Sequence, residues 1–103
     1  MNDMLRVSQN FLRDPRVVGR LLSKTNITSQ DIVYDIGSGK GIIADALAEI
    51  CHSVVCIEFD PRLLDPLKQN LAHHTNAIVY EADVLLLPLP QPPLRYLSTF
   101  HSI

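Results

Sequence analysis

A glycine-rich run joins a β-type segment to a helical one in the first half of the chain. The run reads Asp-Ile-Gly-Ser-Gly-Lys-Gly over residues 35–41, it overlaps the end of the β-rich segment 31–36, and apolar residues at helical spacing follow from 42 to 50. Glycine allows a tight turn and lets a ligand approach the backbone with no Cβ in the way. The helix N-terminus beyond the run presents unpaired N–H groups. This junction predicts a ligand site, and the alternative is a turn that only packs helix on strand.

Two more β-type segments follow at 53–59 and 77–82, and a helical segment lies between them. Strands that are almost wholly apolar and alternate with helices are typical of a parallel sheet with helices on both faces. The sequence therefore predicts an α/β fold. From residue 84 the chain is rich in proline and regular structure should break.

The helices have recognisable beginnings. An Asp-Pro pair at 14–15 and another at 60–61 are typical of an N-cap followed by the first helical position. Pro66 complicates the later helix, because it cannot donate a hydrogen bond to residue 62. That helix either kinks at Pro66 or starts late, with Asp65 as its cap.

The spacing of the glycines narrows the class of ligand. It is Gly-x-Gly-x-Gly, whereas dinucleotide enzymes have Gly-x-Gly-x-x-Gly, which argues against a nicotinamide-dependent enzyme. Lys40 is followed by Gly41 instead of Ser or Thr, so the run is no phosphate-binding loop of the Gly-Lys-Ser/Thr type. Asp35 stands two residues before Gly37, and a carboxylate there suits a ligand with an ammonium group better than a pyrophosphate.

Acidic residues also stand at the ends of the other two predicted strands. Glu58 ends the second strand, where a carboxylate can accept both ribose hydroxyls of an adenosine. Asp83 ends the third strand and can accept from an adenine amino group, while the backbone at Val84 meets the ring edge. Open α/β sheets bind ligands at the carboxyl ends of their strands. Each residue alone could be a solvated strand end, but three in a row predict a binding site.

Four segments together resemble a known family. They are Ser-Gln-Asn-Phe-Leu at 8–12, the glycine run at 35–41, Ile-Glu-Phe-Asp at 57–60 and Glu-Ala-Asp-Val at 81–84. In order and spacing they are similar to the ribosomal RNA adenine dimethylases, which include the housekeeping small-subunit enzymes and the erythromycin-resistance methylases. Ser8 and the Gly-Ser-Gly-Lys-Gly loop are closer to the resistance branch. The resemblance runs from residue 8 to about residue 90.

The resemblance implies a Rossmann-like class I S-adenosylmethionine-dependent methyltransferase fold, truncated after about three parallel strands. Residues 1–90 would form the cofactor-binding subdomain, with an extended or irregular arm at 1–13. Residues 91–103 would be an irregular tail. Alternatively, the chain is not part of an enzyme but a non-catalytic binding or oligomerisation module that keeps the fold.

The resemblance also assigns roles around S-adenosylmethionine. Gln9 and Asn10 would fold over its methionine end, with Leu12 beside them, and Asp35 would help hold its amino group. Glycines of the loop would line the cofactor, and the acidic strand ends would hold its ribose and adenine. The full set of expected cofactor-binding residues is Gln9, Asn10, Leu12, Asp35, Gly37, Gly39, Glu58, Asp83 and Val84.

The family's catalytic motif, Asn-Ile/Leu-Pro-Phe/Tyr, does not occur in the sequence. The chain is therefore expected to be catalytically incomplete, and ribosomal RNA, the family's substrate, should bind to it weakly or not at all. Permitted codons for residues 96–103, read one frame over, spell Phe-Ile-Asn-Ile-Pro-Phe-Asn. We therefore hypothesise that the tail is frameshifted, which the nucleotide sequence of the gene would decide.

Charge and hydropathy exclude other classes of protein. The formal net charge is −2, although residues 1–24 hold five basic residues against two acidic ones. Arg16, Arg20 and Lys24 form a basic helical stripe, which is either a solvated face or a minor contact for RNA phosphates. The N-terminus has no apolar signal region, and no apolar run is long enough to span a membrane. We expect a soluble cytoplasmic protein of one small domain.

The cysteines and histidines suggest no metal site. Cys51 and Cys56 match neither a redox motif nor a zinc knuckle, and we expect two reduced core cysteines. His73 and His74 lack partners at metal-binding spacing and should form a polar helix end.

The predicted strand 31–36 would be an unprotected edge, because the strand that pairs with it in the family is missing. Neither proline nor lysine blunts this edge. Two chains could pair along it as an isologous dimer, so a homo-oligomer is predicted. The alternative is that residues 94–103 fold back as a substitute strand.

Overall fold

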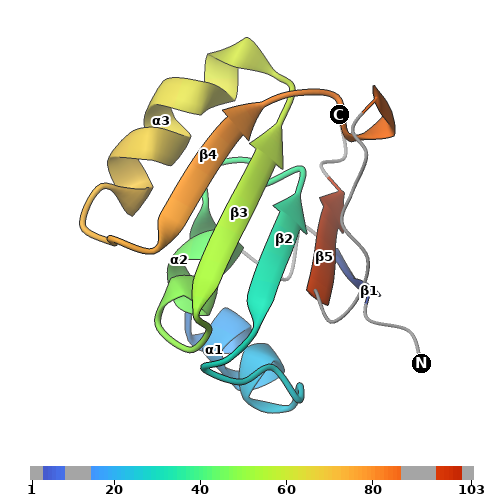
Figure 1. Ribbon diagram of the computed structural model, residues 1–103, viewed down its shortest axis with the longest axis vertical. Coiled ribbons are helices and arrows are strands. Elements are labelled where there is room, and N and C mark those ends of the chain that lie inside the picture. Colours follow the sequence, from blue (N-terminus) through green and yellow to red (C-terminus); the bar gives the residue numbers. More distant parts are fainter. Residues whose placement is uncertain (1–3, 9–14, 87–94, 101–103) are drawn as a thin grey trace.

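The computed structural model describes residues 4–8, 15–86 and 95–100, which form a single parallel sheet with helices packed on it (Figure 1). The helices are α1 (Pro15–Ser23), α2 (Ile42–Ala48), α3 (Pro61–Leu71) and the short 3₁₀ helix η2 (Val84–Leu86). The strands are β1 (Met4–Ser8), β2 (Ile32–Ile36), β3 (Ser53–Glu58), β4 (Ala77–Glu81) and β5 (Arg95–Phe100). In this part of the chain, no helix has the length and apolarity that a membrane crossing requires.

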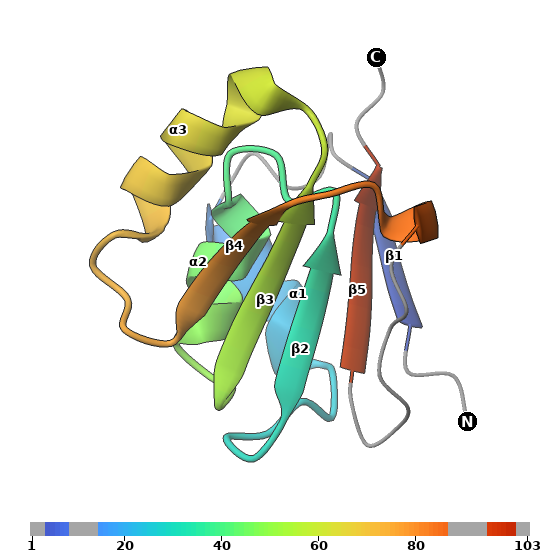
Figure 2. The ribbon, with the colours of Figure 1, turned by 45° about the horizontal axis from the view of Figure 1, so that its top comes forward.

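The sheet has five strands in the order β1-β5-β2-β3-β4, and every neighbouring pair is parallel (Figure 2). β2, β3 and β4 are the three strands that the sequence predicts. Their register sets Val33 opposite Val54, and Val54 opposite Ala77. β1 and β5 add two strands to the three expected, and β1 shows that part of the predicted arm is regular structure.

The prediction of an exposed edge at 31–36 is wrong in this structure. β5 lies along β2, with Tyr34 opposite Tyr96 and Asp35 opposite Leu97. Residues 95–100 of the tail, expected to be irregular, therefore form a strand, and the fold-back alternative describes what is seen. Backbone N–H and C=O groups on an open edge can pair with almost any extended segment, and this one is rich in residues that favour strands. The predicted dimer contact through residues 31–36 is therefore unsupported, because β5 occupies that edge of β2.

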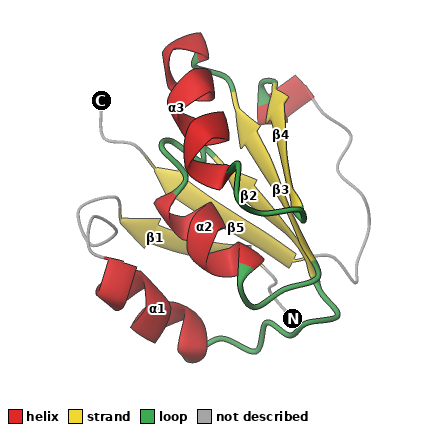
Figure 3. Cartoon of the chain, turned by 90° about the vertical axis from the view of Figure 1, so that its left-hand side faces the viewer, coloured by secondary structure: helices red, strands yellow, loops and turns green. Residues whose placement is uncertain are grey.

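The core lies between the sheet and the helices. Its members come from all three α-helices and from alternate residues of β2 and β3, so α1, α2 and α3 pack on the same face of the sheet (Figure 3). Helices on both faces, as expected from the alternation of elements, are not found in the described residues. The crossovers from β2 to β3 and from β3 to β4 run in the same direction, and right-handed crossovers then place both helices on one side. The buried core cluster comprises Val18, Leu22, Val33, Ile43, Ala44, Leu47, Ala48, Cys51, Val54, Cys56, Leu67 and Leu71.

Helix α3 begins where the Asp-Pro pair predicts. The carboxylate of Asp60 accepts a hydrogen bond from the backbone N–H of Arg62 at 3.0 Å, and Pro61 is the first helical residue. The helix runs through Pro66, so the late start at Asp65 is wrong. Helix α2 ends at Ala48, and Ile50, expected on its apolar stripe, is 37% exposed.

Candidate functional site

The carboxyl ends of β2, β3 and β4 lie side by side and bring the predicted acidic residues to one edge of the sheet (Figure 2). Asp35 is opposite Cys56 in the register, and Glu58 is the last residue of β3. The N–H of Gly37 still donates to the carbonyl of Ile57 at 2.8 Å, so the glycine loop leaves the sheet directly beside Glu58. Asp83 follows the end of β4 by two residues.

The loop glycines have backbone conformations that favour glycine. The φ angles of Gly37, Gly39 and Gly41 are 72°, 61° and 89°, in the left-handed region that other residues rarely adopt. A Cβ on Gly41 would lie 2.8 Å from Cδ1 of Leu67 on α3. This glycine lets α2 and α3 approach each other, a contact between two helices and not the packing of helix on strand that the sequence offered as the alternative.

Glu58 joins the glycine loop to the start of α3. Its side chain is buried at 2% exposure. Oε1 accepts from the N–H of Gly39 at 2.7 Å, and Oε2 accepts from the N–H of Asp60 at 3.1 Å. Hydrogen bonds to a charged acceptor are among the stronger ones. The carboxylate is thus held in place between two loops, a connection that the sequence did not indicate.

Asp35 is fully buried, and neither of its carboxylate oxygens has a hydrogen-bond donor among the described residues. The hydroxyl of the buried Ser38 donates to the backbone carbonyl of Asp35 at 2.7 Å instead. Burial raises the pKa of the Asp35 carboxyl to about 7; the nearby Ser38 hydroxyl lowers the pKa in part, and the charge of Glu58 raises it. A buried carboxyl without a donor, next to the glycine loop, is suited to a cationic partner.

Asp83 is exposed and organises the turn after β4. Its Oδ1 accepts from the N–H of Leu85 at 3.0 Å, and its carbonyl accepts from the N–H of Leu86 at 2.9 Å. The backbone of Val84 is therefore held in the first turn of η2. A carboxylate oxygen can accept more than one hydrogen bond, so this cap leaves Asp83 able to accept from a ligand.

Exposed apolar side chains follow the same strand ends, and the sequence analysis missed them. Phe59, directly after Glu58, is 65% exposed, and Leu85 and Leu86 are 88% and 81% exposed. An aromatic residue just beyond the last acidic residue of an apolar strand is the signal that could have identified Phe59. Such side chains offer a flat or apolar surface to a ligand bound at this edge.

Three predicted residues cannot be placed. Gln9, Asn10 and Leu12 lie outside the described residues, which leave a gap between Ser8 at the end of β1 and the start of α1. Their expected position over the methionine end of a cofactor stays a prediction.

Among the remaining residues singled out by the sequence, Cys56 lies close to this edge, because it is opposite Asp35 in the register. Cys51 and Cys56 are buried and free, and burial raises their pKa values to about 11 and about 12, which keeps both thiols protonated. Arg16 and Arg20 are exposed on α1, where they line a shallow depression together with Gly19 and Ser23.

The expectation that His73 and His74 lack a partner at metal-binding spacing is wrong for the folded chain. Both imidazoles contact the carboxylate of Asp45, which lies on α2. The sequence could not show this contact, because Asp45 and His74 are 29 residues apart and come together only in the folded chain.

Comparisons with known proteins agree with this fold. The family model "Ribosomal RNA adenine dimethylase" matches residues 2–94. An rRNA adenine N-6-methyltransferase of Escherichia coli is 33% identical over 90 residues, which is 87% of this chain and 37% of that protein. The ribosomal RNA small subunit methyltransferase A of Alkaliphilus metalliredigens is 38% identical over 85 residues, 82% of this chain and 30% of that protein.

Among solved structures, the 23S rRNA methyltransferase ErmE superposes with a TM-score of 0.78 at 30% identity, over 89% of this chain and 38% of that one. The chain thus spans between 30% and 38% of the length of these relatives. The match with the family model covers nearly the whole sequence and includes the glycine loop and all three acidic strand ends. This chain belongs to the ribosomal RNA adenine dimethylase family.

Proposed function

We propose that the chain binds S-adenosylmethionine at the carboxyl ends of β2, β3 and β4. The observation that carries the proposal is the junction at Glu58, where a buried carboxylate and the N–H of Gly39 meet at 2.7 Å beside the turn of the glycine loop. The carboxylate can accept further hydrogen bonds beside those from the backbone. The two ribose hydroxyls of the cofactor are the donors that this position suits.

Other residues at this edge would contact the remaining parts of the cofactor. Asp35 would accept from the ammonium group of the methionine part, which supplies the donor that its buried carboxylate lacks among the described residues. An ammonium beside Asp35 would favour the charged carboxylate and so lower its pKa again. Asp83 would accept from the adenine amino group, with the ring edge at the backbone of Val84 and the ring face against an exposed apolar side chain such as Phe59.

In the whole protein we propose methyl transfer to adenine N6 of ribosomal RNA, as the name of the Escherichia coli relative indicates for that protein. When bound, S-adenosylmethionine supplies a methyl group on a sulfonium, which an amine can attack. The part of the reaction assigned to this chain is to hold and orient the cofactor, and positioning accounts for much of the rate of such transfers. Because its substrate would be ribosomal RNA, the whole protein would act in the cytoplasm. The basic side chains of α1 are candidates for a minor contact with RNA phosphates.

Calorimetric titration with S-adenosylhomocysteine tests the cofactor site. Glu58→Ala removes the proposed ribose acceptor, and hydrogen bonds to a charged group are worth about 1.5–3 kcal/mol, so the Kd should rise roughly 10- to 150-fold. Glu81→Ala is the matched control, because Glu81 is exposed on β4 and is opposite Glu58 in the register. Circular dichroism would confirm that both variants fold.

Equal affinity of the wild type and Glu58→Ala would contradict the assignment of Glu58. Weaker binding by both glutamate variants would point to a general effect of negative charge at this edge of the sheet. Neither result is expected, because Glu58 is buried at the loop and Glu81 is not.

A further inference from the structure

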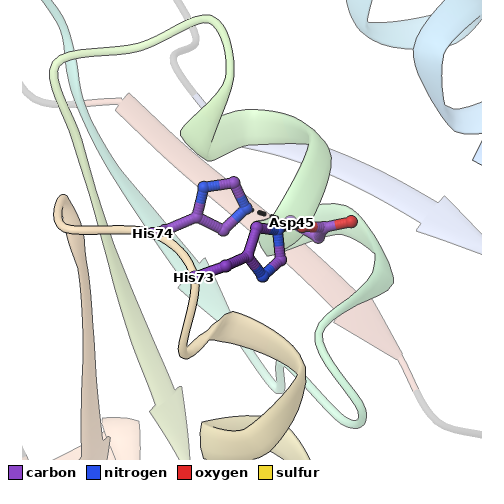
Figure 4. A group of neighbouring side chains, drawn as sticks. All are labelled: Asp45, His73 and His74. Atoms are coloured by element: carbon purple, nitrogen blue, oxygen red, sulfur yellow. Dashed lines mark hydrogen bonds and ion pairs between the residues drawn. The ribbon is translucent and has the colours of Figure 1, made fainter.

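A cluster of two imidazoles and one carboxylate joins α2 to the segment after α3 (Figure 4). Nε2 of His74 lies 2.6 Å from Oδ1 of Asp45, and Nε2 of His73 lies 3.1 Å from the same oxygen. The two imidazole rings are 4.0 Å apart between centroids. One ligand atom from each of the three residues lies within 4.8 Å of the others.

These are the donor atoms that Zn²⁺ prefers. Imidazole nitrogen and carboxylate oxygen bind it at about 2.0–2.2 Å, and tetrahedral geometry then separates neighbouring ligands by about 3.3 Å. The two contacts with Asp45, at 2.6 and 3.1 Å, differ from that spacing by less than 1 Å. Small rotations of two partly exposed side chains would therefore open the space for an ion, with water as a fourth ligand.

The exposure of the three side chains suits an ion that enters from solvent. The side chain of His74 is 6% exposed, which fixes one ligand within the structure. The side chains of His73 and Asp45 are 66% and 49% exposed, so the outer half of the cluster is open and adjustable. The local charge is also suitable, since Asp45 and the neighbouring Glu49 are both acidic and no pairing with lysine or arginine is seen among the described contacts of this cluster.

Glu49 lies near the second ring nitrogen of His74, at a distance longer than a hydrogen bond. Its Oε2 lies 3.8 Å from Nδ1 of His74, on the side of the ring opposite to the nitrogen that faces Asp45. Histidines that bind metals commonly donate their second ring N–H to a carboxylate, which sets the tautomer and makes the free nitrogen more basic. Glu49 is the C-cap residue of α2 and follows Asp45 by one helical turn, so both carboxylates face the histidines.

We propose that Asp45, His73 and His74 form a Zn²⁺ site on the helical side of the sheet, with Glu49 supporting His74. The site lies apart from the cofactor edge but is connected to it through α2. The N–H of Asp45 donates to the carbonyl of Gly41, the N-cap residue at the end of the glycine loop. A bound ion would link the segment after α3 to α2 and so stabilise the folded chain.

Titration of the full chain with ZnSO₄ in a buffer that does not bind metal tests the proposal. We expect one equivalent of Zn²⁺ and a melting temperature that rises with its concentration, whereas Mg²⁺, which prefers oxygen ligands, should have no effect. Co²⁺ in place of Zn²⁺ should give the visible absorption of a tetrahedral site.

Single substitutions assign the ligands. Asp45→Asn and His73→Gln alter partly exposed side chains, so the fold should survive and Zn²⁺ binding should be lost. Glu49→Gln should weaken binding roughly 10- to 100-fold, the range for an outer partner. His52→Gln is the control, because His52 is an exposed histidine outside the cluster whose Nδ1 lies 2.8 Å from Oγ of Ser53.

Failure of the wild type to take up Zn²⁺ saturably would overturn the proposal, and so would binding that Asp45→Asn and His73→Gln leave unchanged. Binding that His52→Gln abolishes would also overturn it. After any of these results, Asp45, His73 and His74 would be a hydrogen-bonded contact between α2 and the segment after α3, with no role in metal binding. Cofactor affinity is measured separately, so the outcome here is independent of the proposed function.

Discussion

The buried Glu58 connects two backbone segments that border the proposed cofactor site. Its two carboxylate oxygens accept from the backbone of Gly39 and of Asp60, so they align the glycine loop with the start of α3. The loop glycines in turn need the left-handed conformations that only glycine adopts at little cost. A substitution at either partner therefore disturbs the proposed cofactor site through the backbone.

Two glycines offer a matched pair of substitutions. Gly41→Ala places a Cβ at φ +89° and 2.8 Å from Leu67, so we expect the free energy of unfolding to fall by about 1–3 kcal/mol. Gly19 lies within α1 with no atom within 4 Å of an added Cβ. Gly19→Ala should therefore raise stability by roughly 0.5–1 kcal/mol. Urea midpoints of the two variants measure both effects, and a shift in the same direction for both would contradict the explanation.

Asp35 should make stability depend on pH. Its pKa is raised to about 7 in the folded chain from an ordinary 3.8, so between these values the folded state binds more protons than the unfolded state. The contribution of Asp35 to stability is therefore most favourable below pH 4, falls as the pH rises to about 7, and stays low above that. Asp35→Asn should remove this dependence and stabilise the ligand-free chain at pH 8, by up to about 4 kcal/mol.

The measurement is the difference in unfolding free energy between the wild type and Asp35→Asn at pH 5 and at pH 8. The comparison of the two proteins cancels the other titrating groups. An equal difference at both pH values would show that Asp35 is charged in the folded chain throughout this range.

At the scale of elements, α3 depends on a cap that lies directly beside the proposed site. The Asp60 side chain accepts from the N–H of Arg62, and the Asp60 N–H donates to Glu58. Pro61 is well placed as the first helical residue, whereas Pro66 removes one hydrogen bond from the middle of the helix. A helix weakened in its middle relies more on its first turn.

Asp60→Ala should therefore lower the free energy of unfolding by about 0.5–2 kcal/mol, the usual range for the loss of an N-cap. Asp60→Asn is the control, because asparagine also caps helices well and should cost little. Thermal melts followed by circular dichroism measure both. Similar losses in the two variants would mean that the negative charge of Asp60, and not its cap, is what matters.

At the scale of the whole molecule, β5 completes the sheet between β1 and β2. Both of its neighbours are parallel to it, and its register with β2 includes Leu97 opposite Asp35. A strand with partners on both sides provides backbone hydrogen bonds in both directions, so its loss would leave β2 with an open edge.

Leu97→Pro should break this arrangement, because proline cannot donate within a sheet and is confined to edges and bulges. We expect a lower melting temperature and self-association through the exposed edge of β2. Light scattering after size exclusion should give a mean mass above that of the wild type, whose chain mass is 11.5 kDa. Leu97→Ala keeps the backbone donor and is the control. An unchanged melt and mass for the proline variant would show that β5 contributes little to the sheet in solution.

The catalytic capacity of the chain is a further prediction at this scale. Its 103 residues contain no Asn-Ile/Leu-Pro-Phe/Tyr sequence to accept the hydrogens of the target amine and stack on its base. We expect the chain by itself to bind S-adenosylhomocysteine but to transfer no methyl group. Incubation with radiolabelled S-adenosylmethionine and ribosomal RNA measures this, and stoichiometric methylation of adenine N6 would contradict it.

Local signals were enough to predict the elements that frame the proposed site. The glycine run, the Asp-Pro pairs and the apolar segments depend on backbone preferences and periodicity within a few residues, and α1, β2, β3, α3 and β4 follow them closely. Parallel strands bring their carboxyl ends to one edge, so the sequence also indicated where Asp35, Glu58 and Asp83 would lie. The family followed from the same segments.

The order of the central elements, the edge that they present and the residue types on it therefore follow from local sequence. Three contacts appear only in the folded chain: β5 pairs with β2, Glu58 accepts from Gly39 across 19 residues, and His74 contacts Asp45 across 29 residues. The difference lies in the range over which each interaction acts. Turn chemistry and periodicity act between near neighbours, whereas a backbone edge or a carboxylate accepts any suitable donor that the folded chain brings to it, and the sequence does not specify which one arrives.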